Sequence, residues 1–100
     1  MTRSVRLGAL AVADLVALHR WVRAEAGQAT ADAYLDRIEV RIATLADFPD
    51  RGTLRDDLAP GLRTLAFERR LVIAYLVAAE TVTVLRVVSG ARDLGGVFAG

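Results

Sequence analysis

Residues 62–88, LRTLAFERRLVIAYLVAAETVTVLRVV, contain three β-rich runs in close succession. The runs are Leu62–Phe67, Arg70–Val77 and Val82–Val88. Only Glu68 and Arg69 separate the first two runs, and residues 78–81 separate the last two. Connections this short permit antiparallel hairpins alone, because a parallel crossover requires about a dozen residues or more. The stretch therefore predicts three consecutive antiparallel strands.

The second and third runs are apolar at nearly every position. A strand with only one covered face would alternate between apolar and polar residues. We therefore expect both faces to be covered, one by helices and the other by a partner, since the chain has no further element large enough. Arg86 interrupts the third run, and a buried arginine without a counter-charge is costly. Either it pairs within the chain, with Glu68 or Asp93, or it faces a binding partner.

Two amphipathic helices are predicted upstream of the strands. The first has an apolar face at helical spacing, and Gly27 follows it, as glycine commonly follows a helix end. Thr30 has the character of an N-cap for the second helix, and Pro49 closes that helix because the residue before a proline avoids helical angles. The two apolar faces comprise Ala11, Leu15, Leu18, Val22 and Ala26, then Tyr34, Leu35, Ile38, Ile42 and Leu45. A joint this tight predicts an antiparallel helical hairpin.

The remaining segments complete the predicted order. Residues 3–7 alternate and predict a short strand that ends at Gly8. Residues 49–61 hold both prolines and indicate a loop with one helical turn around Leu54–Leu58. Residues 89–100 contain four glycines and no strong pattern, which indicates a mobile tail. The order β-α-α-β-β-β predicts an α+β fold, in which a helical hairpin packs on one face of a small, mostly antiparallel twisted sheet.

The composition describes one globular domain and excludes several classes of protein. The chain has 100 residues, of which 54% are apolar and 25% charged, values typical of a single domain. It has no cysteine and one histidine, His19, which excludes disulfides, zinc–thiolate sites and histidine-rich metal sites. The net charge is +1, whereas direct nucleic-acid binding is typical of strongly basic chains. Asp56 and Asp57 lack further ligands and indicate a solvated loop rather than a metal site.

The sequence also predicts the location of the protein. The longest apolar run, Leu71–Ala79, is far shorter than the ~20 residues that a membrane helix requires. The first residues lack the apolar core of a secretory signal. We therefore expect a cytoplasmic protein that does not enter a membrane.

Several short motifs follow one another along almost the whole chain. They are Ala13-Asp14-Leu15, Gly27, Ala33, Leu45-x-x-Phe48-Pro49-x-x-Gly52, Pro60-Gly61-Leu62-Arg63, Tyr75 and the run from Leu85 to Leu94. This ordered set resembles the RelE/ParE superfamily of bacterial type II toxins. The resemblance implies a toxin held inactive by an antitoxin, whose C-terminal part is disordered when free and folds as it binds. It also implies one of two activities, since RelE-like toxins cut messenger RNA on the ribosome and ParE-like toxins act on DNA gyrase.

Residue chemistry separates these two branches. RNA cleavage requires a base, an acid and cations that stabilise the phosphorane. All 13 basic residues are arginine, and arginine is a poor base at its high pKa. By resemblance to RelE-like tails, Arg92 matches a phosphate-binding arginine, Phe98 replaces the acid–base tyrosine, and Ser89 stands where relatives often carry histidine. These departures favour the ParE-like branch, with no catalytic residue and no cofactor.

The ParE-like interpretation implies two binding surfaces. The gyrase-binding residues are expected at the exit from the sheet, and they are Arg86, Arg92, Asp93, Leu94 and Phe98. The antitoxin-binding residues are expected to be Trp21, Tyr34, Arg69, Arg70 and Tyr75, because an apolar groove flanked by arginines suits the acidic, amphipathic C-terminal segment of a ParD-like antitoxin. Two alternatives stay open: a RelE-like ribosome-dependent endoribonuclease that uses arginines alone, and a toxin fold that has lost toxicity and serves as a binding protein.

Overall fold

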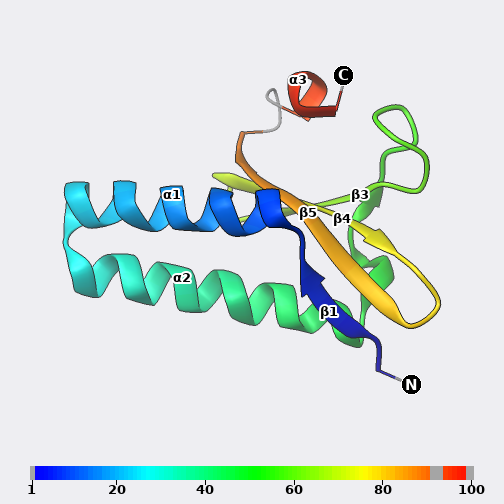
Figure 1. Ribbon diagram of the computed structural model, residues 1–100, viewed down its shortest axis with the longest axis horizontal. Helices are drawn as coiled ribbons and strands as arrows, with labels where there is room; N and C mark the ends of the chain where they lie inside the picture. Colours follow the sequence, from blue (N-terminus) through cyan, green and yellow to red (C-terminus); the bar gives the residue numbers. More distant parts are fainter. Residues whose placement is uncertain (1, 91–93, 99–100) are drawn as a thin grey trace.

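The computed structural model describes residues 2–90 and 94–98, and it has a helical hairpin on one face of a five-stranded sheet (Figure 1). The elements are β1 (Ser4–Leu7), α1 (Ala9–Ala26), α2 (Gln28–Ala43), the 3-10 turns η1 (Thr44–Ala46) and η2 (Pro49–Arg51), β2 (Thr53–Leu54), β3 (Arg63–Phe67), β4 (Leu71–Val77), β5 (Thr81–Ser89) and α3 (Leu94–Phe98). The strands lie in the order β1-β5-β4-β3-β2. β1 is parallel to β5 and all other neighbours are antiparallel, which confirms the predicted α+β class.

A single residue, Gly27, joins the two long helices. Its φ of +94° lies in the left-handed region that glycine adopts without strain, so the chain reverses with no longer loop. The prediction that Thr30 caps α2 is wrong, because α2 already begins at Gln28 with Gly27 as its N-cap. Near this joint, His19 Nε2 and a carboxylate oxygen of Asp32 lie 2.8 Å apart and link the two helices. None of the described helices is long and apolar enough to cross a membrane.

The segment after α2 differs from the predicted loop. The α-helix ends at Ala43, earlier than predicted, and continues as the tighter η1, while Pro49 opens η2. A short strand, β2, then pairs with β3. The predicted helical turn is found slightly later in the chain, since the Arg55 carbonyl oxygen accepts the Leu58 and Ala59 N–H groups at 3.0 and 3.3 Å, while Leu54 itself pairs with Arg63 at the edge of the sheet.

Tyr75 anchors this segment from inside the core. Its Oη donates a hydrogen bond to the Pro49 carbonyl oxygen at 2.7 Å and accepts one from the Gly52 N–H at 2.9 Å. A Cβ on Gly52 would collide with the Tyr75 hydroxyl and ring, so this position requires glycine. Tyr75 has no exposed area. Its assignment to the antitoxin surface is therefore a correction that the structure imposes, since a partner cannot reach this ring.

The main core lies between the helical hairpin and the sheet. It is built from α1, α2, η1 and strands β3 to β5, and its buried residues are Ala11, Leu15, Ile38, Ile42, Leu45, Phe67, Leu71, Ile73, Tyr75, Val82, Val84 and Val87. Both predicted helical faces contribute to it, because apolar residues at a spacing of three and four lie on one side of a helix.

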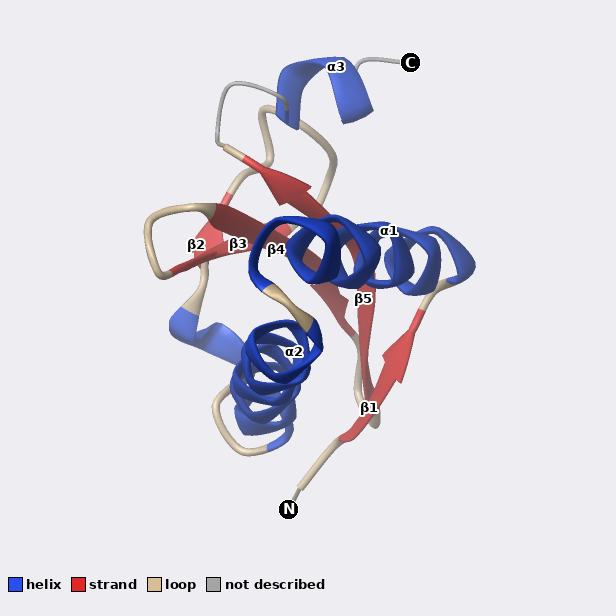
Figure 2. Cartoon of the chain, turned by 90° about the vertical axis from the view of Figure 1, so that its left-hand side faces the viewer, coloured by secondary structure: helices blue, strands red, loops and turns tan. Residues whose placement is uncertain are grey.

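The opposite face of the sheet is covered in part by the chain itself. Val72 and Val88 form a second, smaller cluster with Leu58, Val97 and Phe98. The last two belong to α3, which lies beyond the C-terminal end of β5 (Figure 2). The sequence predicted a mobile tail here and no element able to cover this face. The structure instead shows a helix over residues 94–98, because two apolar side chains find a matching apolar patch on β4 and β5.

Candidate partner-binding groove

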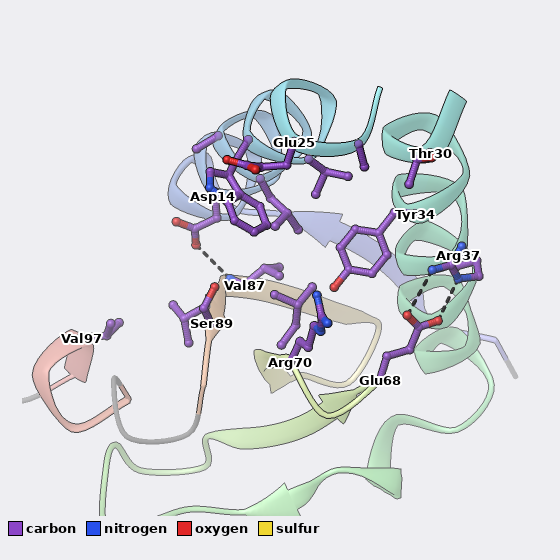
Figure 3. Close-up of a pocket in the computed structure, with 17 residues that line it drawn as sticks. Asp14, Glu25, Thr30, Tyr34, Arg37, Glu68, Arg70, Val87, Ser89 and Val97 are labelled. Atoms are coloured by element: carbon purple, nitrogen blue, oxygen red, sulfur yellow. Dashed lines mark hydrogen bonds and ion pairs between the residues drawn. The ribbon is translucent and has the colours of Figure 1, made fainter. Parts of the chain in front are cut away.

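The helical hairpin projects beyond the sheet (Figure 1). A groove opens beneath the projecting part (Figure 3). The groove has a volume of about 1180 Å³. Its walls come from α1, α2, the β3–β4 turn, the adjoining ends of β4 and β5, and α3. The apolar side chains that line it include Leu18, Trp21, Val22, Tyr34, Leu71 and Val87. A concave apolar surface of this size is typical of a binding site.

Two aromatic side chains reach the groove from different helices. Trp21 of α1 is 58% exposed, so most of its ring is free to contact another molecule. Tyr34 of α2 is half-buried, with its ring centroid 6.0 Å from that of Phe67 and 5.2 Å from the Arg37 guanidinium carbon. Large aromatic rings that stand partly free in an apolar groove are typical anchors for a protein partner.

The β3–β4 turn brings arginines to one wall of the groove. Glu68 and Arg69 occupy its two central positions with φ values of +48° and +62°. Such a turn matches the twist of a hairpin, but it is strained for residues other than glycine, asparagine and aspartate. The Phe67 carbonyl oxygen accepts the Arg70 N–H at 3.1 Å and closes the turn. From α2, Arg37 donates two hydrogen bonds to the Glu68 carboxylate, at 2.8 and 3.1 Å.

This wall carries a local excess of positive charge. The hydrogen bond from Arg37 is the main reason that the pKa of Glu68 lies below its ordinary value, and Arg41 and Arg70 lower it further. The same hydrogen bond raises the pKa of Arg37. Three arginines thus act on one carboxylate, and Arg69 follows it in the turn. Acidic side chains on a partner would therefore be attracted to this end of the groove.

Asp14 of α1 contributes to another wall and binds β5. Its Oδ2 accepts a hydrogen bond from the Val87 N–H at 2.9 Å (Figure 3). The same oxygen accepts one from Arg86 Nε at 2.8 Å, and Oδ1 accepts one from Arg86 Nη2 at 2.9 Å. The Arg86 and Asp14 side chains are 26% and 16% exposed, which makes this the least exposed ion pair among the described residues. Glu68 is therefore not the partner of Arg86, because it binds Arg37, and Asp93 lies outside the described residues.

Comparison with known proteins identifies the family. The family model described as the ParE toxin of the type II toxin–antitoxin system parDE matches residues 5–94. The chain belongs to the ParE toxin family. Toxin ParE3 of Caulobacter vibrioides is 38% identical over 81 residues, which cover 81% of this chain and 80% of that toxin. A solved structure, the chromosomal ParDE TA system from P. aeruginosa, matches with a TM-score of 0.77 at 25% identity, over 88% of this chain and 96% of that one.

The structure of this ParE toxin brings together part of the predicted antitoxin surface. Trp21, Tyr34 and Arg70 line the groove, and Arg69 adjoins it in the β3–β4 turn. Tyr75 does not contribute, because it is buried in the main core. The predicted surface is thus reduced to four residues around one groove.

The predicted gyrase surface of the ParE toxin is only partly described. Arg86 is held by Asp14. Leu94 and Phe98 belong to α3, where Phe98 packs against the apolar patch on β4 and β5. Arg92 and Asp93 lie outside the described residues.

Sequence reasoning missed several groove residues of the ParE toxin. Asp14, Leu18 and Val22 recur every four residues along α1, and all three line the groove. Leu18 and Val22 belonged to the predicted apolar face of this helix, whereas Asp14 entered only as part of a motif of the superfamily. No local pattern shows that the helix extends past the sheet, so the outer part of that face was assigned to the core. Val97 was missed because residues 89–100 gave no periodic signal.

Proposed function

We propose that this ParE toxin is neutralised by a ParD-type antitoxin that folds into the groove beneath the helical hairpin. The observation that carries this proposal is an apolar groove of about 1180 Å³ with arginines along one wall. An apolar surface left open to water favours a partner that fills it. A solved structure with the same fold is described as a ParDE system, which pairs the two components.

The groove fits an acidic amphipathic segment. The apolar face of such a segment would contact Leu18, Trp21 and Tyr34, and its carboxylates would meet Arg37 and Arg70 on the wall formed with the β3–β4 turn. A segment that folds as it binds pays for its own ordering, so a few buried anchors dominate the affinity. Charge complementarity at the wall fixes the direction in which the segment lies and speeds association.

We further propose that the toxin inhibits DNA gyrase through the exit from the sheet, with Arg86, Arg92, Asp93, Leu94 and Phe98 as contacts. Val97 of the same segment lines the antitoxin groove. An antitoxin bound in the groove would therefore lie against the toxic segment, which supports neutralisation by occlusion. Gyrase acts on the chromosome, so the proposed location is the cytoplasm.

The placement of His19 and Tyr75 gives neither side chain an acid–base role in the groove. Tyr75 is buried, and its hydroxyl forms hydrogen bonds with the backbone of Pro49 and Gly52. His19 forms a hydrogen bond with Asp32 between the two helices. Of the histidine and the two tyrosines in the chain, only Tyr34 lines the groove. Burial raises the pKa of Tyr34 above its ordinary value, which moves this group further from the range useful for general acid–base catalysis.

The antitoxin site is tested with Trp21→Ala. We expect the affinity for the ParD-type antitoxin encoded beside the toxin to fall about 30-fold, because a central aromatic anchor contributes about 2 kcal/mol. Titration calorimetry measures the affinity, and thermal unfolding checks that stability is unchanged. The matched control is Val40→Ala, since Val40 is 67% exposed on α2 and does not line the groove. Equal losses in the two variants would contradict the proposed site.

The target is tested by pulse labelling after induction of the toxin alone. Thymidine and amino-acid incorporation are followed in parallel, and we expect DNA synthesis to fall first. A variant with Arg92→Ala and without residues 94–100 is expected to lose growth arrest while it still binds the antitoxin. Protein synthesis that falls first would select the ribonuclease alternative, and full toxicity of the variant would contradict the proposed target surface.

A further inference from the structure

The two halves of β5 have different neighbours along the edge that faces away from β4. From Thr81 to Val84 this edge pairs with β1, and the Gly8 N–H donates to the Val84 carbonyl oxygen at 2.8 Å. The chain then leaves the sheet and begins α1 at Ala9, so β1 offers no partner to the second half of β5. Backbone groups at an open edge need other partners where water is excluded.

Asp14 supplies a partner at this open edge. Its carboxylate accepts the Val87 N–H and two N–H groups of the Arg86 guanidinium, so it stands where a longer β1 would present a carbonyl group. Gly8 permits this approach of α1 to the sheet, because a Cβ there would lie only 3.2 Å from the Val84 carbonyl oxygen. The Asp14 carboxylate thus replaces one backbone hydrogen bond that a neighbouring strand would have made with β5.

A β-bulge in β5 directs the Arg86 side chain and the Val87 N–H toward α1. Tyr75 of β4 is opposite Val84 and Ala74 is opposite Arg86, so Leu85 is an extra residue without a partner on β4. A bulge bends its strand and re-aims the side chains beyond it. Charge-assisted hydrogen bonds are about twice as strong as neutral ones, and three of them on one half-buried carboxylate hold the bulged strand in one orientation.

The residue that follows Val87 in β5 contacts α3. Val88 follows Val87 directly, and Val97 and Phe98 pack on Val88 and its neighbour Val72. We infer that Asp14 is a positioning residue, which fixes the end of β5 and thereby the patch on which α3 docks. The effect on toxicity rests on the function proposed above for the C-terminal segment, whereas the effect on α3 does not.

The test compares Asp14→Asn with the wild-type toxin by NMR. We expect the Val87 amide to exchange about 10- to 100-fold faster, because the loss of a hydrogen bond to a charged group destabilises the closed state by that factor. The Val97 methyl and Phe98 ring signals are expected to move toward their solvent-exposed values. Arg86→Lys keeps a cation beside the carboxylate and so preserves the fold, and it should shift the same signals less and in the same direction.

The control is Tyr75→Phe, which destabilises the fold at the far end of the same strands without touching Asp14. A merely structural role for Asp14 would make both variants alter the Val97 and Phe98 signals alike, and that result would overturn the inference. Unchanged Val97 and Phe98 signals in Asp14→Asn would also overturn it. Shifted signals with undiminished growth arrest would support the positioning role of Asp14 and contradict the proposed gyrase surface.

Discussion

The two ends of the β4–β5 strand pair are built for different tasks. At one end Tyr75 is fully buried, its hydroxyl is bonded to Pro49 and Gly52, and β1 and β3 flank the pair on both sides. At the other end β1 has already left the sheet, the helical hairpin projects past the strands, and Trp21 is 58% exposed. The closed end is held together around a buried hydroxyl, whereas the open end leaves apolar area and arginines uncovered in a groove.

Stability and recognition are therefore separable within a chain of 100 residues. Among the described residues, no buried side-chain nitrogen or oxygen lacks a hydrogen-bond partner. The closed end therefore stabilises the fold without an unpaired polar group in the core. The apolar lining of the groove is stabilised only when another molecule covers it. Changes at the closed end should therefore alter the free energy of unfolding, and changes at the open end should alter antitoxin binding.

Gly52→Ala is expected to have the largest effect and to confirm the role of the closed end. The new methyl group would overlap the Tyr75 hydroxyl and the Thr64 carbonyl oxygen, so we expect the free energy of unfolding to fall by about 3 kcal/mol. Urea denaturation measures the change. Gly96→Ala is the control, because nothing lies within 4 Å of the added carbon. A similar loss in both variants would show that the packing around Tyr75 is not decisive.

Arg69→Gly is expected to have a smaller effect, of opposite sign. Arg69 adopts a φ of +62°, and glycine accepts that conformation without strain, so the free energy of unfolding should rise by about 0.5–1 kcal/mol. The same substitution removes one cation beside the groove and should slow association with an acidic antitoxin. Thermal unfolding and stopped-flow binding measure the two changes. Lower stability would contradict the backbone strain at Arg69, and association at the wild-type rate would contradict a role for this arginine at the open end.

Glu68→Gln is expected to change stability least, since the Arg37–Glu68 pair is exposed and exposed pairs contribute little. The folded-state pKa of Glu68 is below its ordinary value of 4.5. Its stabilising contribution is therefore present above pH 4.5 and is lost as the pH falls through the lowered value. The difference in melting temperature between wild type and variant should vanish in acid.

The same variant should bind an acidic antitoxin faster at low salt, by about two- to tenfold, because the arginine wall loses its one carboxylate. Stopped-flow association at two ionic strengths measures this. Slower association would mean that the Glu68 carboxylate itself contacts the partner.

The sequence predicted those parts of the fold that depend on local periodicity. The strands β3 to β5 and the apolar faces of α1 and α2 follow from residue spacing, and the superfamily follows from an ordered set of motifs. Thr30 was mistaken for a helix cap because the single left-handed Gly27 reverses the chain, and a propensity pattern does not reveal that geometry.

The parts that could not be predicted depend on contacts distant in the sequence. β2 and η2 are fixed by Tyr75, which lies 23 residues from Gly52 and 26 from Pro49. The partner of Arg86 is Asp14, 72 residues away. Of the candidate site, Trp21, Tyr34 and the arginines of the turn were identified by residue type, but the groove itself exists only because two helices extend past a sheet.

The pairing of β1 with β5 also sets the order in which the toxin matures during synthesis. Residues 4–7 pair with residues 81–84, and Asp14 binds residues 86 and 87, so the first strand completes its hydrogen bonds with the last strand of the described residues. Contacts between distant segments form late, because the intervening chain must be made and ordered first. A nascent chain that has left the ribosome only as far as β4 can form the helical hairpin. It cannot yet form the complete sheet, the hydrogen bonds between Asp14 and β5, or the complete groove. The groove is therefore completed only after β5 has been synthesised.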